Sequence, residues 1–397
     1  MSHSDSFNFA PLAEGHTSAL WPAVGTSTFN QSFAASALVA PAAGHIAIVG
    51  AGNAARSLAC FLSKQGFSPH ILVRSAEKVK NLAQRKSIAC VGKVEGDFSI
   101  VEATIDPGPM LAKCATVFVA TTTDAYTDVA RRLAPYLTEH HEVILFSGKF
   151  AGVVEFKNAL GARANYPTIV ETDSLFASRI QEDESVWIRG IKKWTLYTSW
   201  NKSQTKRSSS IMRRFFPGID EAENVVQRGL TDFGAFAHPS TMIANMTNVD
   251  RNTGFLFYYE GFTPNTLILL EQLEEEFRSI ARAYETSIIP MKELLNRYYG
   301  CDTSGDLLQA MRTVPNYSFS KAPGTLQHRF IEEDVASSLV PMQQLAVKAK
   351  VRIPLIDSIV SISSVLLQRD FASNGRTLGK LGWADMSHAE ILRAIYE

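Results

Sequence analysis

At 397 residues the chain is too long for one hydrophobic core, and with about 150 residues per domain two or three domains are expected. Its 39 basic and 39 acidic residues cancel, which argues against a protein that binds nucleic acid or an anionic membrane over its whole surface. Its 4 cysteines are scattered and include no CxxC pair, which argues against a disulfide framework or a metal site and favours a reducing compartment.

Neither a membrane span nor a secretion signal is expected. The most apolar early stretch, residues 33–55, is interrupted by Pro41, Gly44 and Gly50, whereas a span requires about 20 apolar residues in a row. The first basic residue is Arg56, so the basic leader of a signal peptide is missing. We therefore expect a cytoplasmic protein.

Residues 1–44 differ in composition from the rest of the chain. They are rich in Ser, Ala and Thr and contain scattered aromatic residues without periodicity. This composition predicts a flexible or loosely draped arm. The alternative is that its aromatic side chains pack on another surface or join the two subunits of a homodimer.

From His45 onward, short apolar runs alternate with helix-forming stretches. The predicted strands are 45–49, 69–73, 116–120 and 143–146, the predicted helices between them are 53–65 and 125–137, and a last strand pair is expected at 189–199. Such alternation predicts parallel pairing through right-handed crossovers, and hence a doubly wound α/β sheet.

The second half of the chain has a different pattern. The polar, Ser-rich stretch 201–210 is expected to be an exposed connection between domains. Beyond it, apolar residues at three- and four-residue spacing predict helices at 267–284, 339–349 and 355–367. We therefore predict a separate, mainly helical substrate domain over residues 206–397.

A glycine-rich turn follows the first predicted strand. The run Gly50-Ala51-Gly52-Asn53-Ala54-Ala55 opens a helix there, which is the context that a G-x-G-x-x-G/A dinucleotide fingerprint requires. Gly50 allows the tight turn, and Gly52 lets the backbone approach the pyrophosphate. The helix N-terminus at Asn53 and Ala54 offers N–H donors to the phosphates. The sequence therefore predicts an NAD(P)-binding Rossmann domain over residues 45–205.

The end of the second predicted strand indicates which cofactor binds. Sites for NADH place Asp or Glu there, whereas this chain has Arg74-Ser75, with Lys78 one turn later. A guanidinium and a hydroxyl would bind a 2′-phosphate, so we predict NADPH over NADH. The alternative is that Arg74 is a solvated surface charge that stacks on the adenine.

The run that follows the third predicted strand is expected to line the nicotinamide side of the site. Thr121 and Thr122 stand at the carboxyl edge, where open α/β sheets bind ligands. The alternative for the nearby Asp124 is that it only caps the following helix.

Hydride transfer needs an acid–base group near the reacting carbon, and histidine is the usual choice near neutral pH. Of the 9 histidines, His238 lies in an apolar stretch at the start of the helical half, with Asn245 two helical turns later. A histidine in such a setting is also typical of a hydrogen-bonded core residue, so the pattern alone leaves both readings open.

Further segments carry a combined signal. In chain order they are Ile169-Val170-Glu171-Thr172-Asp173-Ser174-Leu175, His238-Pro239 with Asn245, Phe257-Tyr258-Tyr259-Glu260-Gly261, and Ala322-Pro323 followed by His328-Arg329-Phe330 and Glu333-Asp334-Val335. Together with the glycine-rich turn they resemble the octopine/nopaline (opine) dehydrogenase family. The resemblance spans roughly residues 45–397. It implies reductive condensation of an amino acid's amine with a 2-oxo acid, through an imine and hydride transfer.

The resemblance also implies roles for individual residues. His238 falls on the family's catalytic histidine and Asp334 on its carboxylate partner, which would fix the imidazole tautomer. His238 would donate a proton as the carbinolamine loses water, or polarise the carbonyl. Asn245 and Arg329 would hold polar groups of the substrates. The alternatives are a helix cap for Asp334 and an interdomain salt bridge for Arg329, and His328 is expected to be structural.

Three functions remain open at this stage. The leading one is an NADPH-dependent opine-type dehydrogenase that uses small-molecule substrates, an amine and a 2-oxo acid. Residues 124–126 also resemble the family's subgroup that makes opine-type metallophores, whose amine substrates are larger. The alternatives are a simple 2-oxo-acid or hydroxy-acid reductase and a non-catalytic NADP(H)-sensing protein.

Overall fold

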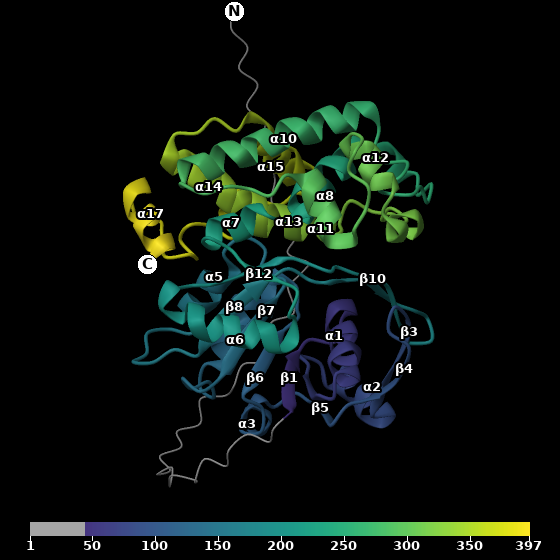
Figure 1. Cartoon of the computed structure of the whole chain (residues 1–397), viewed down its shortest axis with the longest axis vertical. Helices are drawn as coiled ribbons and strands as arrows, with labels where there is room; N and C mark the ends of the chain where they lie inside the picture. The colour runs from purple at the N-terminus through teal and green to yellow at the C-terminus, as the bar shows by residue number, and fades with distance from the viewer. Residues whose placement is uncertain (1–43) are drawn as a thin grey trace, which may run out of the picture. The chain divides into compact units, whose positions relative to one another are not determined.

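The computed structural model describes residues 44–397, so the predicted N-terminal arm lies outside the described residues except for Gly44. Within this range the first half of the chain is built around a large sheet and the second half is almost entirely helical (Figure 1). None of the helices in residues 44–397 combines the length and apolar character that a membrane-spanning segment requires.

The large sheet has 8 strands in the order β12-β11-β8-β7-β6-β1-β2-β5. Their bounds are β1 His45–Val49, β2 Ser68–Leu72, β5 Glu102–Thr104, β6 Thr116–Val119, β7 Glu142–Phe146, β8 Thr168–Thr172, β11 Leu196–Ser199 and β12 Asp220–Glu221. Neighbouring strands from β5 to β8 run parallel, and β11 pairs antiparallel with β8. The doubly wound sheet and the four apolar strands expected from the sequence are confirmed.

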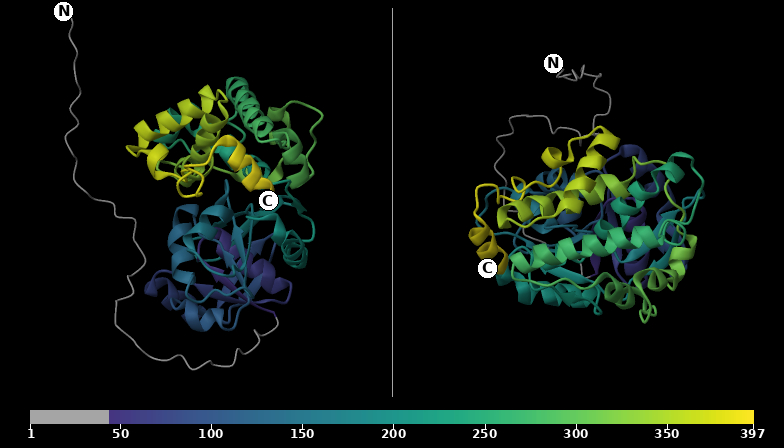
Figure 2. Two further views of the ribbon diagram at one scale, coloured as in Figure 1. Left: turned by 90° about the vertical axis from the view of Figure 1, so that its left-hand side faces the viewer. Right: turned by 90° about the horizontal axis from the view of Figure 1, so that it is seen from above.

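Helices cover both faces of this sheet (Figure 2). They are α1 Asn53–Lys64, α2 Ala76–Arg85, α3 Pro107–Leu111, α4 Tyr126–Leu133, α5 Gly152–Ala159 and α6 Thr205–Phe215. Alternate residues of each strand point to one face, so Ile46 and Ile48 of β1 join a core cluster with α1 and α6. This packing holds the ends of β1 and β6 in fixed positions beneath the helical half.

A second sheet of four strands, in the order β4-β3-β10-β9, corrects one prediction. Its strands are β3 Ser87–Gly92, β4 Gly96–Ser99, β9 Phe176–Ile180 and β10 Val186–Ile191. The predicted strand pair at 189–199 is wrong, because β10 belongs to this small sheet and β11 to the large one. The polar residues between them carry the chain from one sheet to the other.

The predicted exposed connection at 201–210 is also wrong. A 3₁₀ turn, Lys202–Gln204, leads directly into α6, whose residues Ser208, Ile211 and Met212 are buried against the sheet. The polar start of this helix faces outward, which is why its composition looked like a linker. Since β12 follows α6, the sheet continues past residue 205, and the division at residues 205/206 stays a prediction.

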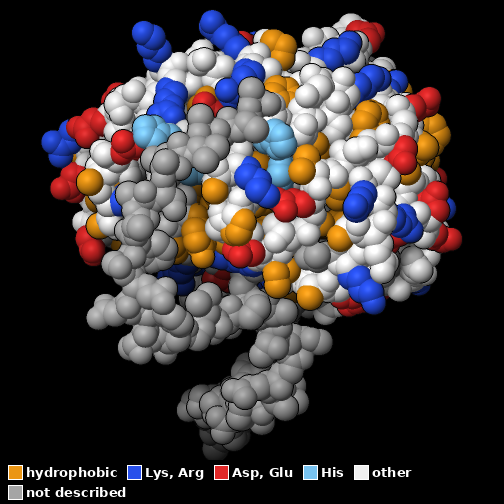
Figure 3. Space-filling model, turned by 90° about the horizontal axis from the view of Figure 1, so that it is seen from below, with side chains coloured by type: hydrophobic (Ala, Val, Ile, Leu, Met, Phe, Trp, Pro, Cys, Tyr) orange, Lys and Arg blue, Asp and Glu red, His pale blue; other side chains and the backbone are white. Residues whose placement is uncertain are grey.

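The helical half contains helices of 4 to 20 residues. Their bounds are α7 Val225–Leu230, α8 Phe233–Ala244, α9 Met246–Asp250, α10 Pro264–Ala283, α11 Met291–Tyr299, α12 Leu307–Arg312, α13 Arg329–Asp334, α14 Val340–Ala349, α15 Pro354–Leu367, α16 Phe371–Asn374 and α17 His388–Tyr396. The helices predicted from apolar spacing correspond to α10, α14 and α15. On the face drawn in Figure 3, side chains of both charge signs are interspersed.

Candidate active site

The glycine-rich turn between β1 and α1 has the geometry that a phosphate group needs. Gly50 adopts a φ of +122°, and a Cβ there would lie 2.6 Å from the carbonyl oxygen of Ala120, so only glycine fits. A Cβ on Gly52 would meet no atom of residues 44–397 within 4 Å, so the space in front of the turn is open. The first N–H groups of α1 receive no side-chain cap within this described range, which leaves them to a ligand.

Two side chains brace this turn from the protein side. Asn53 Oδ1 accepts a hydrogen bond of 2.9 Å from the backbone N–H of Ile180, so its side chain ties α1 to β9. Arg56 Nε donates to the carbonyl of Ala51, and its guanidinium pairs with Glu184 at 2.8 Å. Asn53 and Ala54 open α1, and among residues 44–397 no side chain caps the N-terminus of this helix.

The residues expected to choose the cofactor follow β2, beside the end of β1. Arg74 is exposed, and Ser75 occupies the N-cap position of α2 without a side-chain cap bond in the described structure. Lys78 belongs to the first turns of α2, and its side chain lies outside the described set. The backbone therefore places all three residues at the carboxyl edge where the fingerprint also lies.

The threonines after β6 stand at the same edge. The hydroxyl oxygen of Thr121 is buried and has no hydrogen-bond partner among residues 44–397. Thr123 bonds through its N–H to Glu333 at 3.0 Å and through its hydroxyl to Ser337 at 2.7 Å, which connects this edge to the helical half. Asp124 is exposed and caps neither the 3₁₀ turn nor α4, so the helix-cap alternative is wrong.

His238 and Asp334, 96 residues apart in sequence, are brought into direct contact. His238 lies in the middle of α8 and Asp334 at the end of α13, and Nδ1 of the imidazole is 2.7 Å from Oδ2 of the carboxylate. The ring of Phe330 stacks on the imidazole with centroids 3.8 Å apart. Both side chains are largely buried, at 13% and 3% exposure. Asp334 is therefore no simple helix cap.

The hydrogen bonds continue on both sides of this pair. Lys149, which follows β7, places its Nζ 2.5 Å from Asp334 Oδ1 and 3.1 Å from Asp232 Oδ2. At the other end, the hydroxyl of Tyr258 is 2.8 Å from His238 Nε2. These five residues form one row, Asp232–Lys149–Asp334–His238–Tyr258, which we call the proton row.

Burial and charge set the protonation states of the proton row. Burial would raise the pKa of Asp334, but the charge of Lys149 and the bond to His238 outweigh it and lower that pKa to about 2. Burial lowers the pKa of His238 below its usual 6.5, although Asp334 opposes the shift. Burial also opposes the charge of Lys149, but Asp232 and Asp334 prevail and raise its pKa. An ionised Asp334 accepts from Nδ1–H, so the lone pair of the neutral imidazole lies on Nε2.

The two predicted substrate ligands lie at the ends of the helices that carry this pair. Asn245 directly follows the last residue of α8, and its amide nitrogen donates to the carbonyls of Thr241 and Gly261 at 3.0 and 2.9 Å. Arg329 begins α13 with its side chain 64% exposed, 3.9 Å from Glu333 of the same helix. The interdomain salt bridge considered for Arg329 is therefore wrong.

Sequence reasoning missed Lys149 and the contact of Tyr258. Lys149 follows a buried strand at the carboxyl edge, which was the available signal, but its partners come 83 and 185 residues later. Tyr258 stands in the quoted Phe257–Gly261 motif without an assigned role. His328 accepts a bond from the N–H of Phe330 at the start of α13, which agrees with the structural role expected for it.

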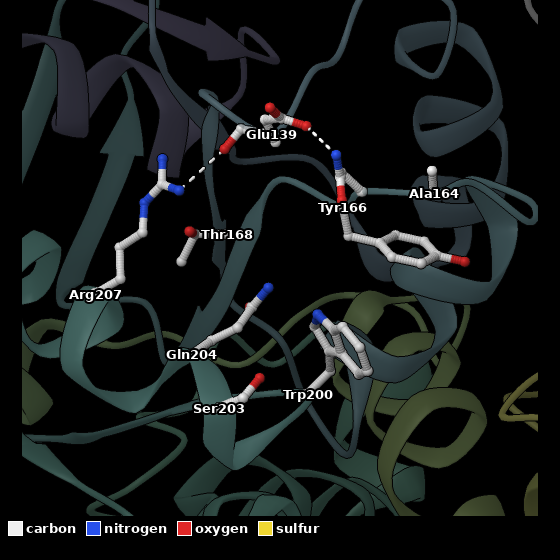
Figure 4. Close-up of a pocket in the computed structure, with 9 residues that line it drawn as sticks. Glu139, Ala164, Tyr166, Thr168, Trp200, Ser203, Gln204 and Arg207 are labelled. Carbon is white, nitrogen blue, oxygen red and sulfur yellow. Dashed lines mark hydrogen bonds between the residues drawn. The ribbon is translucent and has the colours of Figure 1, made fainter.

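A surface pocket of about 440 Å³ lies elsewhere, beside β8 and α6 (Figure 4). Arg207 donates to the backbone carbonyl of Glu139 at 3.0 Å, and Asn165 donates to the carboxylate of the same residue. Gln204 likewise bonds to the backbone of Pro167 and Ile169. Because these polar groups satisfy one another, we assign no chemistry to this pocket.

Comparison with known proteins gives two family matches along the chain. Residues 221–367 match the alpha-helical domain of NAD/NADP octopine/nopaline dehydrogenase, and residues 46–166 match ketopantoate reductase PanE/ApbA. An opine dehydrogenase from Arthrobacter sp. (strain 1C) is 28% identical over 352 residues, which cover 88% of this chain and 98% of that protein. Protein ocs of Agrobacterium vitis is 23% identical over 88% of this chain and 98% of its own length.

Solved structures share the fold. An octopine dehydrogenase with NADH and L-arginine has a TM-score of 0.70 at 18% identity, covering 88% of this chain and 97% of that one. A yersinopine dehydrogenase with bound NADP+ has a TM-score of 0.64 at 17% identity, covering 90% and 98%. The two-part architecture, a sheet half followed by a helical half, is therefore common to these proteins and this chain.

Proposed function

The chain belongs to the octopine/nopaline dehydrogenase family, and from this premise we propose that it is an NADPH-dependent opine-type dehydrogenase. It is an oxidoreductase that acts on CH–NH groups, and it condenses an amine with a 2-oxo acid. Beyond this reaction class, we propose which cofactor the enzyme prefers, which residues act in catalysis and in which order the steps occur. The observation that carries it is the contact between His238 and Asp334.

The proposed reaction begins with attack of the amine on the 2-oxo carbon. The resulting carbinolamine loses its hydroxyl group as water when His238 delivers a proton, which leaves a protonated imine, the iminium. The reducing equivalent for the imine carbon is supplied by the bound nicotinamide. The product is a secondary amine that carries two carboxylates when the amine substrate is an amino acid.

The proton row supports this assignment physically. Asp232, Lys149 and Asp334 together carry one negative charge, which an imidazolium on His238 would neutralise in a largely buried site. Asp334 holds Nδ1–H, so the proton to be delivered sits on Nε2. The hydroxyl of Tyr258 is the first group that this proton meets.

The cofactor site fits a dinucleotide phosphate. The open space before Gly52 and the uncapped N-terminus of α1 would hold the pyrophosphate, and the buried, unpartnered hydroxyl of Thr121 would face the nicotinamide half. Arg74, Ser75 and Lys78 would hold the 2′-phosphate, where a cofactor without that group needs a carboxylate.

The test is NADPH oxidation with pyruvate, 2-oxoglutarate or glyoxylate, each with and without a panel of amino acids. Turnover that depends on the amine supports the proposal. Turnover with the 2-oxo acid alone would instead favour a simple keto-acid reductase, the alternative to which the ketopantoate reductase match at residues 46–166 points. The same assays with NADH measure the cofactor preference.

We also propose a cytoplasmic homodimer. All four cysteines of the chain, Cys60, Cys90, Cys114 and Cys301, fall within the described residues and are free buried thiols, which suits a reducing compartment. Sedimentation equilibrium of the purified chain tests the dimer.

A further inference from the structure

Strand β10 carries an irregularity at Arg189. In its antiparallel pairing with β9, Ile188 stands opposite Ser178 and Gly190 opposite Ala177, so Arg189 is an extra residue without a partner on β9. Such a bulge turns a side chain away from the regular alternation and is frequent beside active sites. The side chain of Arg189 therefore does not follow the regular alternation of side chains along β10.

The guanidinium of Arg189 has no carboxylate partner. Its Nη1 donates to the carbonyl of Phe319 at 3.3 Å and to the hydroxyl of Ser320 at 3.2 Å. Its Nε is buried without a hydrogen-bond partner, and no Asp or Glu of residues 44–397 lies within 4.0 Å of it. Arg189 is half-buried, so its charge is partly desolvated without a carboxylate to compensate, which is unfavourable.

The segment that accepts a hydrogen bond from Arg189 also contacts the proton row. Phe319 and Tyr317 belong to one short 3₁₀ segment, Pro315–Phe319. The ring of Tyr317 stacks on that of Tyr258 with centroids 3.9 Å apart, and the Tyr258 hydroxyl bonds to His238. Arg189 is therefore connected to His238 through this segment and the two stacked rings of Tyr317 and Tyr258.

A second hydrogen-bond donor without a partner lies next to the bulge. Asn316 is only 6% exposed, and its amide nitrogen has no hydrogen-bond partner among the described residues. Its amide group lies against Gly190, where a Cβ would approach within 2.9 Å of Asn316 Cγ. The bulge thus brings a half-buried guanidinium, whose Nε is enclosed, and a buried amide, both with unused N–H groups, to one side of the site.

We propose that Arg189, assisted by Asn316, binds the carboxylate of the amino substrate. This inference rests on the proposed function, in which the product carries two carboxylates while the family resemblance supplies only Arg329 for them. An unpaired guanidinium and an unpaired amide match the acceptors of one carboxylate.

In this proposal each of the two arginines, Arg189 and Arg329, binds one of the two carboxylates of the product. The guanidinium carbon of Arg329 lies 5.9 Å from the ring centroid of Phe330, and that ring stacks on His238, so Arg329 is near the group that acts on the oxo carbon. Arg189 and Arg329 both oppose the burial that raises the pKa of Tyr258. Arg329 therefore suits the carboxylate of the 2-oxo acid, which is one bond from the reacting carbon, and Arg189 suits the carboxylate beyond the nitrogen.

The test uses two small secondary amines that differ by one carboxylate, iminodiacetate and N-methylglycine. Calorimetry measures their binding to the enzyme loaded with NADP+, in metal-free buffer. We expect the wild-type enzyme to prefer iminodiacetate by about 10- to 100-fold, the range for a hydrogen-bonded charge. Arg189→Gln should abolish this preference and leave the affinity for N-methylglycine unchanged.

Arg179→Gln is the matched control, because it removes an exposed positive charge from the same β9–β10 hairpin. It should keep the preference for iminodiacetate. Arg189→Lys retains the charge but not the planar fork, and should keep a reduced preference even if the glutamine variant does not fold. A wild-type enzyme without the preference, or an Arg189→Gln variant that retains it, would overturn the inference.

The outcome is separable from that of the proposed function. A preference that depends on Arg189, in an enzyme without amine-dependent turnover, would support the carboxylate site and reject the proposed reaction. Amine-dependent turnover in an enzyme whose binding of iminodiacetate ignores Arg189 would support the reaction and reject the site.

Discussion

Lys149 Nζ lies 2.5 Å from Asp334 Oδ1, the carboxylate oxygen that His238 does not use. The lysine therefore fixes the rotation of the carboxylate, so that Oδ2 faces the imidazole. It also keeps Asp334 ionised in a place where burial alone would favour the neutral acid. We therefore propose Lys149 as a positioning residue for the proposed catalytic pair, His238 and Asp334.

Replacing Lys149 with Met should lower both turnover and stability. The variant leaves Asp232 and Asp334 buried without their shared cation, and breaking a buried ion pair costs about 3–5 kcal/mol. We expect the pKa of His238 to rise, because the charge of Lys149 lowers it in the native protein. Turnover, denaturant unfolding and the pH dependence of turnover measure these effects.

Lys192→Met is the control for this variant, since Lys192 pairs with the buried carboxylate of Asp173 outside the proton row. It should reduce stability with a much smaller loss of turnover. Full turnover in Lys149→Met would show that Asp334 needs no cation to hold its place.

His238→Ala should reduce turnover by at least about 10²-fold, the usual size of a general acid–base contribution. The imidazole is the group that both donates its Nδ1–H to Asp334 and presents Nε2 to the site. The affinity for NADPH should change little, because the fingerprint at β1 and α1 does not contact His238. Fluorescence titration with NADPH, beside the steady-state assay, separates the two effects, and unchanged turnover would reject the assignment.

Asp334→Asn should impair turnover nearly as much as loss of the histidine. An amide can present its N–H₂ to Nδ1, which would shift the imidazole proton to Nε2 in the neutral ring and leave it with the wrong tautomer. It also removes the charge that stabilises the imidazolium. The shape of the side chain is retained, so folding can be verified by circular dichroism. A wild-type rate would reduce Asp334 to a structural residue.

The sequence predicted the parts of the site that are local. The turn from β1 into α1 can be recognised from about a dozen consecutive residues, because Gly50 and Gly52 must stand directly after a strand. His238 and Asp334 were found only through the family resemblance, since nothing in their own neighbourhoods indicates that they meet. Spacing alone left His238 as either a core residue or a catalyst.

What the sequence missed depends on distant contacts. The role of Lys149 depends on its ion pairs with Asp232 and Asp334, which belong to other parts of the chain. Arg189 looked like part of a strand pair, because a bulge leaves no mark on the apolar pattern of β10. The prediction of a linker at 201–210 was wrong for a related reason. The apolar residues of α6 cluster in its last turns, so the polar composition of its first turns gave no sign of a helix.

The titration of His238 should lie below the usual value of 6.5. Burial disfavours the imidazolium more than Asp334 favours it, so the pKa in the folded protein is lowered. The unfolded chain then binds more protons than the folded one at mildly acidic pH, and this residue's contribution to stability declines as the pH falls below 6.5. Nitrogen NMR of labelled imidazoles measures the midpoint, with His238→Ala to identify the signal.

The same spectra of Asp334→Asn provide a second check on the titration. Because Asp334 raises the pKa of His238 against burial, its removal should move the midpoint further down. A midpoint that stays in place, or moves up, would contradict the coupling of these two residues.

Arg74→Ala should weaken NADPH far more than NADH. A guanidinium bound to the 2′-phosphate contributes about 1.5–3 kcal/mol as a charge-assisted hydrogen bond, which corresponds to a rise in KM of about 10- to 100-fold. NADH lacks that phosphate, so its KM should stay nearly constant. Steady-state kinetics with both cofactors measure the ratio, and Lys80→Ala, an exposed cation further along α2, is the control for general charge. Equal losses for the two cofactors would show that Arg74 stacks on the adenine and does not select the phosphate.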